Sequence, residues 1–532
     1  MRRFNVTGLC VPEEDYMVDI SGKIGQIVKL VNERRYFTIN RARQYGKTTT
    51  LSQLKLALNE DYVVISISFE GLGDESFATA ETFCQALIKQ VVKALRLSSA
   101  PQAYADSWAD CNAADFIALS AHITNMCRDQ KVVLMIDEVD KSTNNRVMIH
   151  FLGMLREKFL ARRASKDHTF HSVILAGVYD IRNIKLKMIN DGLYTPSQTD
   201  GQIYNSPWNI AVNFDVDMSF SPPEIATMLS DYEADHHTGM DIGLISEEIH
   251  THTSGYPFLV SRICQCIDEE LDKDWTKTGL QEAIKRILHE ENVLFDDISK
   301  NLENNKELYD FLYSLLIVGE RKSFTLTNPV VKMASMYGYI KRGNGVTGKS
   351  ATGPATIANK MFEMLLSYYF SSKDENVSRM EGSFTRGLYQ EVVKGNTFDM
   401  ELCMRRFTEH YRELYAEADA TFLERHGRLL FLSWLKPLVN GKGFYHIESQ
   451  FTDTRRMDVV VDFGSDQFII ELKIWRGEAA QDKAYDQLLD YMDAKNTDKG
   501  YLLTFDFRKV QNKADKADWV QVGGKEIFEV IV

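Results

Sequence analysis

An apolar run followed by two acids is the sequence feature that most constrains the fold. Residues 131–140 read Lys-Val-Val-Leu-Met-Ile-Asp-Glu-Val-Asp. A strand that is apolar at consecutive positions has both faces covered, which is typical of a parallel sheet with helices on each side. Further strand patterns at residues 61–69 and 172–178 alternate with helical patterns. The first part of the chain is therefore predicted to be a parallel α/β sheet.

A phosphate-binding loop is indicated by residues 36–54, where a β-type run precedes Gly46-Lys47-Thr48 and a helical pattern follows. In such a loop Gly46 lets the backbone approach phosphate, Lys47 reaches the terminal phosphates and the Thr48 hydroxyl faces Mg²⁺. Arg41 stands where the first glycine of the G-x-x-x-x-G-K-[ST] pattern belongs, so the strict pattern fails. Gly-Lys-Thr alone at a helix start does not define a nucleotide site.

The acids that end the 131–140 run are the second motif that points to a nucleotide site. They emerge at the carboxyl end of a parallel strand, where doubly wound sheets bind their ligands. Asp137 is predicted to hold Mg²⁺ through water, and Glu138 to orient or deprotonate the attacking water. The alternative is a buried strand that ends in solvated acids. Together the two half-motifs predict a nucleotide site.

Two arginines, Arg162 and Arg163, precede the strand pattern at residues 172–178. They fit arginine fingers that act in trans within a homo-oligomer, or partners of a helix dipole. Asp180 and Arg182 follow the same strand, at the place where AAA-type ATPases carry a γ-phosphate sensor, but the sequence singles out no sensor residue.

A second candidate site lies on a predicted β-hairpin formed by residues 459–463 and 468–475, with a Gly-Ser-Asp turn signal between them. Glu471 and Lys473 are two positions apart, so a strand presents them on one face. Asp458 can bring a second carboxylate to the same end, and such oxygen ligands suit Mg²⁺ or Mn²⁺. This set suits phosphodiester hydrolysis. The alternative is a charge pair on a solvated edge strand.

The elements around the hairpin supply two more polar groups. Glu424 lies on a helical pattern before it, Gln487 lies on one after it, and a strand pattern at residues 501–507 follows. The order of helix with Glu, strand with Asp, strand with Glu-x-Lys, helix with Gln, and strand resembles the PD-(D/E)XK nuclease superfamily.

This resemblance implies a role for each residue. Asp458 and Glu471 would bind the metal, and Glu424 would reach it directly or through water. Lys473 would orient the attacking water or stabilise the transition state, and Gln487 would hydrogen-bond water or backbone phosphate. For Gln487, the alternative is an ordinary amide on a helix surface. Three arginines are candidates for phosphate contact: Arg455, Arg456 and Arg476.

The stretch Y-F-x-I-x-R-A-R-Q-Y-G-K-T at residues 36–48 resembles the R-P-R-R-F-G-K-S loop of the bacterial AAA-ATPase-like family. That family also lacks the first Walker glycine, and its members often carry a C-terminal PD-(D/E)XK-type nuclease domain. Ala42, Tyr45 and Thr48 depart from the family's proline, phenylalanine and serine. Three further stretches are similar to the lid region of these ATPases: residues 206–214, 222–229 and 253–260.

Residues 301–372 resemble the winged-helix module that commonly follows such ATPase cores. Helical patterns are followed by a strand pattern and a Gly-rich run at residues 343–353. Lys341, Arg342 and Lys349 fit a DNA-reading role, and a structural spacer is the alternative.

Composition restricts the class of protein. The chain has 532 residues, too many for one core, and 44% hydrophobic with 26% charged residues describes an ordinary globular protein. A net charge of −13 argues against a generally basic nucleic-acid coat protein but leaves room for a local basic groove. The seven cysteines form no C-x-x-C pair. Neither a signal peptide nor a membrane-spanning run is found, so we expect a cytoplasmic protein without a membrane partner.

We therefore predict an α/β fold with a P-loop AAA-type parallel sheet, a helical lid, a winged-helix-like linker and a restriction-endonuclease-like α/β domain. The predicted boundaries are residues 1–220 for the ATPase core, 221–300 for the lid, 301–372 for the linker and 373–532 for the nuclease-like domain. The predicted cofactors are ATP and Mg²⁺, and the predicted partner is nucleic acid, with DNA favoured over RNA. Nucleotide state is expected to gate cleavage. The alternative is a non-catalytic nucleotide switch whose C-terminal domain only binds nucleic acid or a protein.

Overall fold

The computed structural model describes most of the chain, in two compact units. The described residues are 2–139, 146–178, 208–290, 293–318, 320, 322–343, 353–373, 386–395, 397–415, 420–439, 443–448, 458–464, 466–475, 478–506 and 516–532. The first unit comprises Met1–His236 and Tyr256–Ser261, and the second comprises His237–Gly255 and Arg262–Val532. The predicted boundaries at residues 220, 300 and 372 come from motifs rather than from packing, and they stay predictions.

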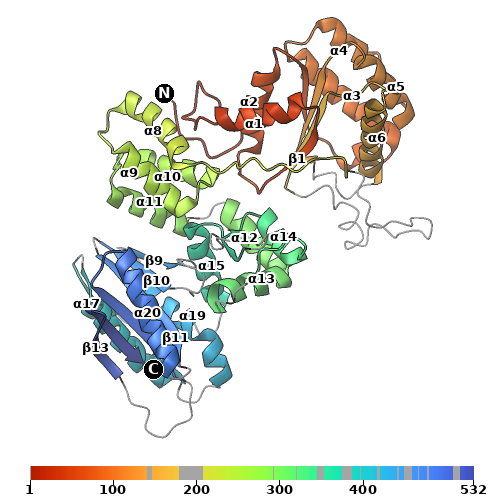
Figure 1. The fold of residues 1–532 in the computed structure, drawn as a ribbon. Helices are drawn as coiled ribbons and strands as arrows, with labels where there is room; N and C mark the ends of the chain where they lie inside the picture. The colour runs from red at the N-terminus through yellow and green to blue at the C-terminus, as the bar shows by residue number, and fades with distance from the viewer. Residues whose placement is uncertain are drawn as a thin grey trace. The chain divides into compact units, whose positions relative to one another are not determined.

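The first unit is built on a parallel sheet, of which β1 is labelled in Figure 1. The sheet has four strands in the order β1-β4-β3-β2. Its strands are β1 (Tyr36–Asn40), β2 (Val63–Ser68), β3 (Val132–Asp137) and β4 (Ser172–Gly177). Every residue of β3 and β4 is buried, as the apolar runs predict. The parallel α/β sheet expected from the sequence is confirmed.

Helices cover both faces of this sheet (Figure 1). On β3, Leu134 and Ile136 pack into one apolar cluster, whereas Val133 and Met135 pack into another on the opposite face. Successive strand residues point to opposite faces, so a strand that is apolar at every position serves two cores. The helices of this unit are α1 (Ser21–Asn32), α2 (Lys47–Leu58), α3 (Ala80–Arg96), α4 (Gln102–Ala109), α5 (Phe116–Met126), α6 (Arg146–Arg163) and α8 (Pro222–His236).

The N-terminal segment is fastened to α8. Phe4 and Tyr16 form a ring cluster with Tyr232, with centroids about 5 Å apart. Arg2 makes ion pairs with Asp231 and Asp235 of α8. These contacts fix the course of the segment that precedes α1.

The second unit begins with helices and a short hairpin. Asn328 caps α14 by accepting from the backbone N–H groups of Val330 and Val331, and Pro329 is the first helical residue, which is a favourable start for a helix. β5 and β6 pair antiparallel, and Ser323 bridges to Pro354 beside them. The elements are α9 (Ile242–Thr253), α10 (Pro257–Glu270, within which the two units divide), α11 (Lys277–His289), α12 (Val293–Asn304), α13 (Lys306–Tyr313), α14 (Pro329–Met336), β5 (Ile340–Arg342), β6 (Ala355–Ile357) and α15 (Lys360–Lys373).

The C-terminal part of the second unit contains a six-stranded mixed sheet with the order β13-β14-β12-β11-β10-β9. β11, β12 and β14 run parallel, and the remaining neighbours are antiparallel. Its elements are α17 (Arg386–Val392), β7 (Val393–Lys394), β8 (Thr397–Phe398), α18 (Met400–Tyr415), α19 (Ala420–Val439), β9 (Gly443–Glu448), β10 (Asp458–Phe463), β11 (Asp466–Ile474), α20 (Glu478–Ala494), β12 (Lys499–Phe505), β13 (Lys516–Val522) and β14 (Lys525–Ile531).

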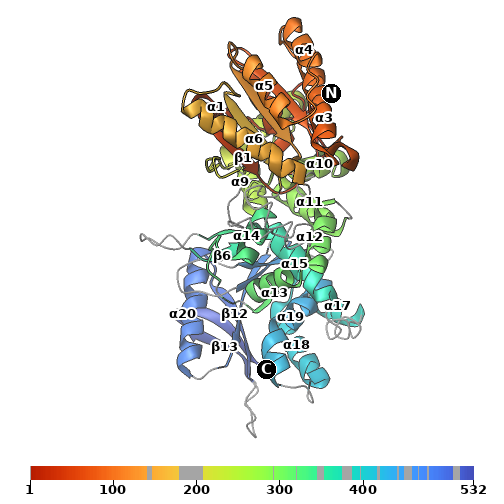
Figure 2. The ribbon, with the colours of Figure 1, turned by 90° about the vertical axis from the view of Figure 1, so that its right-hand side faces the viewer.

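Each face of this sheet is covered by helices (Figure 2). On one face, Ile469 and Leu502 pack with Leu488 of α20 in a single apolar cluster. On the other face, the ring of Phe407 from α18 contacts that of Phe505 from β12. The hairpin predicted near the end of the sequence is therefore an interior part of a sheet that is covered on both sides.

Candidate nucleotide site and candidate nuclease site

The predicted phosphate-binding loop connects β1 to α2. Gly46 lies immediately before the first residue of α2 and has a φ of 72°, and Gln44 has a φ of 55°. Glycine adopts this left-handed backbone without the steric cost that a Cβ brings. Gly46 thus permits the sharp turn that begins α2.

Lys47 and Thr48 occupy the positions that the motif predicts. The buried Lys47 ammonium donates to the carbonyl oxygens of Arg41 at 3.1 Å and Ala42 at 2.9 Å. Thr48 Oγ1 donates to Asp137 Oδ2 at 2.8 Å. The structure therefore brings the two half-motifs, which are 89 positions apart, into direct contact.

Glu138 lies at the carboxyl end of β3. Its backbone N–H donates to Asp137 Oδ1 at 2.9 Å, and its φ is 51°. A left-handed backbone at a non-glycine residue is strained and is often found at functional sites. This conformation turns the chain directly after Asp137, beside the loop.

Arg41 has a packing role that accounts for the missing Walker glycine. Its guanidinium donates to the carbonyl oxygens of Asn40 at 2.9 Å and Val216 at 2.8 Å, and it lies 5.3 Å from the ring centre of Phe214. Burial lowers the pKa of the Arg41 guanidinium, which nevertheless stays a cation. Arg41 is not among the residues with positive φ, so its backbone does not require glycine.

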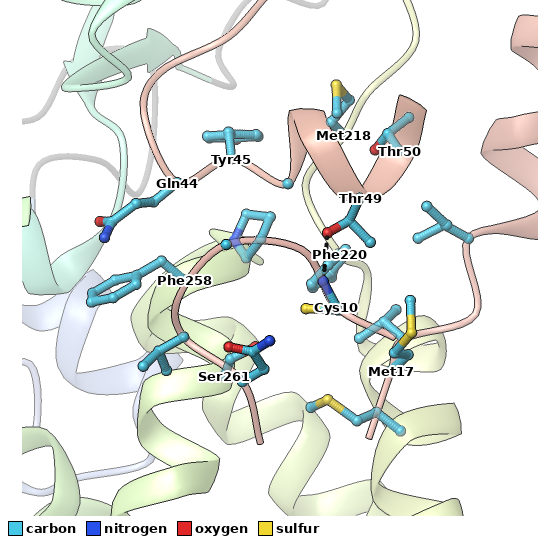
Figure 3. A pocket seen from close by; sticks show the side chains of 18 of the residues that line it. Cys10, Met17, Gln44, Tyr45, Thr49, Thr50, Met218, Phe220, Phe258 and Ser261 are labelled. Atoms are coloured by element: carbon cyan, nitrogen blue, oxygen red, sulfur yellow. Dashed lines mark hydrogen bonds between the residues drawn. The ribbon is translucent and has the colours of Figure 1, made fainter. Parts of the chain in front are cut away.

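A cavity of about 130 Å³ adjoins the loop (Figure 3). Its walls are largely apolar with a few polar groups, which is the usual form of a small-molecule site. The N-terminal segment closes it near the loop, where the Cys10 backbone N–H donates to Thr49 Oγ1 at 3.3 Å. The sequence did not reveal this cavity, because its walls come from four separate stretches. Representative lining residues are Met17, Gln44, Gly46, Thr49, Met218 and Phe258.

The two arginines proposed to act in trans lie at the end of α6. Arg162 donates to the carbonyl oxygens of His171 at 2.9 Å and Arg34 at 3.0 Å, and it lies 5.3 Å from the ring centre of Tyr36. These partners precede β1 and β4, at the amino edge of the sheet, whereas Asp137 lies at the carboxyl edge. This packing favours a structural role for Arg162 over a role as an arginine finger. Arg163 is exposed. Residues 180 and 182 lie outside the described part of the chain.

In the second unit the structure gathers Glu471, Lys473 and Gln487. Glu471 is 1% exposed and forms an ion pair with Lys473, two residues further along β11. Lys473 Nζ donates to Gln487 Oε1 of α20 at 2.7 Å. Gln487 thus contacts the lysine of the predicted motif and is not merely an amide on a helix surface.

Asp458 lies directly opposite Glu471 in the antiparallel register of β10 and β11. Paired residues in such a register share one face of the sheet, so the backbone places a second carboxylate on the face of Glu471. The side chains of Asp458 and of Glu424, on α19, lie outside the described side chains. Among the described ones, no group of three or more His, Cys, Asp or Glu residues is gathered as in a metal site. Arg455, Arg456 and Arg476 also lie outside the described residues.

Two of the three basic residues of the predicted winged-helix module, Lys341 and Arg342, make contacts within the second unit. Lys341 donates to Ser254 Oγ at 2.9 Å, and Arg342 lies 5.6 Å from the ring centre of Phe324. These contacts match the structural alternative for the two side chains. Residue 349 lies outside the described part of the chain.

Comparison with protein families returned one match to each part of the chain. A model described as "AAA-like domain" matches residues 27–345, more than half of the chain, and one described as "PD-(D/E)XK nuclease superfamily" matches residues 444–516. The chain belongs to the AAA-like family and carries a C-terminal domain of the PD-(D/E)XK nuclease superfamily. Membership confirms the predicted family and fold class and implies nucleotide binding.

Comparison with solved structures returned proteins of low sequence identity. A Walker-type ATPase of Pyrococcus abyssi is 13% identical, with a TM-score of 0.44 over 68% of this chain and 99% of that one. The ORC1 protein of Aeropyrum pernix in complex with DNA is 12% identical, with a TM-score of 0.28 over 68% of this chain and 94% of that one. The ADP form of ORC2 from Aeropyrum pernix is 12% identical, with a TM-score of 0.32 over 67% of this chain and 92% of that one.

The search of curated proteins found no match. In the described part of the chain, no helix combines the length and the apolar character needed to cross a bilayer.

Proposed function

We propose that this protein binds and hydrolyses ATP in its first unit and cleaves DNA phosphodiester bonds in a Mg²⁺-dependent reaction in its second. The contact of Glu471 and Gln487 with Lys473 is the observation that carries the nuclease assignment. A solvated charge pair would leave the glutamate exposed, whereas Glu471 is buried. A buried carboxylate beside a lysine suits a phosphate-cleaving site.

The ATPase half of the proposal rests on the contact between Thr48 and Asp137. Lys47 now holds two carbonyl oxygens of its own loop, and the terminal phosphates of ATP would take their place. Thr48 and Asp137 would hold Mg²⁺, which when bound offsets the charge of the β- and γ-phosphates. Glu138, at the end of β3, would orient the attacking water. The cavity beside Gly46 would receive the nucleoside.

In the nuclease half, Glu471 and Asp458 would hold Mg²⁺, with Glu424 as a direct or water-mediated ligand. Carboxylate oxygens are the donors that this ion prefers, and the register of β10 and β11 puts two of them on one face. When bound, the ion supplies Lewis-acid polarisation of the scissile phosphate. Lys473 orients the attacking water or stabilises the negative charge that develops on the phosphate, and Gln487 holds its ammonium in place.

A route for nucleotide gating is offered by α15 within the second unit. This helix contacts α9 and α11 of the helical region, and it also contacts α19 and β9. Ser433 Oγ of α19 donates to Ser371 Oγ at 3.2 Å, and the rings of Tyr368 and Tyr445 lie 6.0 Å apart. A movement of the helical region would therefore reach the strand that pairs with β10.

The decisive experiment compares wild-type protein with Lys473→Ala and Lys483→Ala on duplex DNA, single-stranded DNA and RNA, in Mg²⁺ and with or without ATP. Lys483 lies on the exposed face of α20, so its variant is the matched control. We expect cleavage by wild type and Lys483→Ala and none by Lys473→Ala. Cleavage that survives in Lys473→Ala would remove the nuclease assignment. Equal rates with and without ATP would remove gating.

The same experiment distinguishes the proposed nuclease from the alternative, a non-catalytic nucleotide switch whose C-terminal domain only binds nucleic acid or a protein. A binding domain would retain DNA with an affinity that falls with salt concentration, and it would leave the DNA intact in Mn²⁺.

A further inference from the structure

A second buried polar cluster lies in the C-terminal sheet, centred on Glu529 of β14 rather than on Lys473 of β11. Glu529 of β14 is 1% exposed, and its carboxylate accepts from Gln481 Nε2 of α20 at 2.5 Å. Lys516 of β13 forms an ion pair with the same carboxylate. Gln481 Nε2 also lies 3.3 Å from Thr504 Oγ1 of β12, which is fully buried. Burial and the neighbouring Glu529 raise the pKa of the Tyr485 hydroxyl.

Folding alone does not require such a cluster. A carboxylate that leaves water loses solvation, and a well-packed apolar set in the same space is often at least as stable as a buried ion pair. Directional hydrogen bonds, in contrast, fix the position of the groups that they join. The cluster joins three strands to one helix, so its bonds define where α20 lies on the sheet.

The cluster and the candidate nuclease site share one face of the sheet. Glu471, Thr504 and Glu529 each follow by two positions a residue of the apolar cluster under α20, and residues two apart on a strand point the same way. Thr504 lies directly opposite Lys473 in the parallel register of β11 and β12. The polar groups therefore form a row that crosses the sheet beneath α20.

α20 contacts this row through two amides. Gln481, in its first half, contacts Glu529 and Thr504, and Gln487, six positions later, contacts Lys473. Between them, Ala484 packs against the sheet in the apolar cluster. Apolar contacts resist separation of the helix from the sheet, but they do little to prevent rotation or sliding, because they are not directional. The hydrogen bonds of Gln481 are directional, so they restrict the rotation and sliding of α20 on the sheet.

We propose that Gln481 and Glu529 are positioning residues that fix the rotation of α20, so that Gln487 meets the Lys473 ammonium. This inference rests on the proposed nuclease function, because the group that it positions belongs to that site. Gln481 and Glu529 act through Gln487 and do not contact Lys473 in the structure.

The first test is Gln481→Met, which keeps the length of the side chain and removes the amide. We expect kcat for DNA cleavage to fall about tenfold to a hundredfold, because small displacements of positioned groups have effects of this size. KM for DNA should change less than about twofold, because Gln481 is buried and would not contact DNA directly. In the metal-free protein, amide hydrogen exchange should accelerate in α20 and stay unchanged in β12 and β14. Glu529→Met, which removes the oxygen that accepts from Gln481 Nε2, should have the same effects, and this second variant guards against a failure of the first to fold.

Rescue separates positioning from general stability. Gln481→Glu combined with Glu529→Gln reverses the hydrogen bond, so that an amide on β14 donates to a carboxylate on α20. We expect this double variant to recover most of kcat and the slow exchange of α20. The matched control is Gln521→Glu with Glu526→Gln, an exposed pair on β13 and β14 that is joined by the same kind of bond at 3.3 Å, and it should leave both measurements unchanged.

Each outcome decides one point. Wild-type protein that cleaves nothing would remove the proposed function and this inference with it. If wild type cleaves, wild-type kcat or wild-type exchange in Gln481→Met would overturn the positioning role alone. A double variant that stays as slow as Gln481→Met would also overturn it, since the reversed bond would then fail to restore the site.

Discussion

The two candidate sites are assembled in opposite ways. The nucleotide site takes Lys47 and Thr48 from one loop and Asp137 from the end of one strand. The candidate nuclease site takes Glu471 and Lys473 from one strand and its amide from a helix, and its remaining carboxylates would come from a paired strand and from α19. A site whose residues come mostly from one loop keeps most of its geometry as long as that loop keeps its shape. A dispersed site depends on the packing of every element that contributes.

The largest expected difference is a separation of the two activities. Lys47→Ala should lower ATP turnover by at least about a hundredfold, because removing one preorganised charge from a phosphate site has effects of this size. Lys473→Ala should keep ATP turnover at the wild-type rate while cleavage is lost. A coupled ATPase assay and a DNA cleavage assay on both variants measure this. Lys55→Ala, on the same helix as Lys47, is the control. Loss of ATP turnover in Lys473→Ala would show that the sites are not separate.

The second largest expected difference is in how much a charge-removing substitution at each site lowers local stability. Glu471→Gln removes the charge partner of Lys473 in a buried position, and the free energy of local unfolding at β11 should fall by about 1–3 kcal/mol. Asp137→Asn leaves an oxygen that can still accept a hydrogen bond, so the loss at β3 should stay below about 1 kcal/mol. Native-state hydrogen exchange of the two strands measures both values. Equal losses of local unfolding free energy at β3 and β11 would contradict the proposed difference between the two sites.

This contrast also explains what the sequence could predict. The four strands of the first sheet, the phosphate-binding loop and the β10–β11 hairpin follow from local patterns of apolar residues and turns. The order of elements in a family assigned Lys473 and Gln487 to one candidate site, but the contact between these two side chains was not predicted. The cavity beside Gly46 was missed because tertiary packing of the N-terminal segment creates it, and no local pattern encodes that packing.

The strands β13 and β14 were also missed, and with them Glu529. Here a local signal exists. Gly523 and Gly524 both have positive φ and form the two-residue turn that favours a β-hairpin. The pairing of β14 with β12 remained hidden, because 19 residues separate these two strands and nothing in the segment fixes their register. The fold was thus more predictable than the supporting contacts of the site.

A smaller effect is expected from restoring the missing Walker glycine. Arg41→Gly removes two hydrogen bonds to backbone carbonyls and the contact with Phe214. The free energy of unfolding of the first unit should fall by about 1–2 kcal/mol, since each bond contributes about 1 kcal/mol and water replaces part of it. ATP affinity should stay within about twofold, because the backbone at residue 41 already has an ordinary φ. Chemical unfolding and nucleotide titration measure the two values. Tighter ATP binding in Arg41→Gly would show that arginine weakens the loop.

The smallest expected effect on stability concerns Gly46, and it tests how local the nucleotide site is. Gly46→Ala places a Cβ on a backbone with a φ of 72°, which costs about 1 kcal/mol. The nearest atoms to that Cβ belong to Pro257 at 4.0 Å, an ordinary contact, so the cost comes from the backbone and not from a clash. The free energy of unfolding should therefore fall by only this amount, while ATP affinity falls further because the Cβ stands where phosphate approaches. Gly22→Ala, in open space at the start of α1, is the control. If Gly46→Ala reduced the free energy of unfolding and the free energy of ATP binding by the same amount, backbone strain in the loop would explain both losses. The Cβ would then not obstruct phosphate.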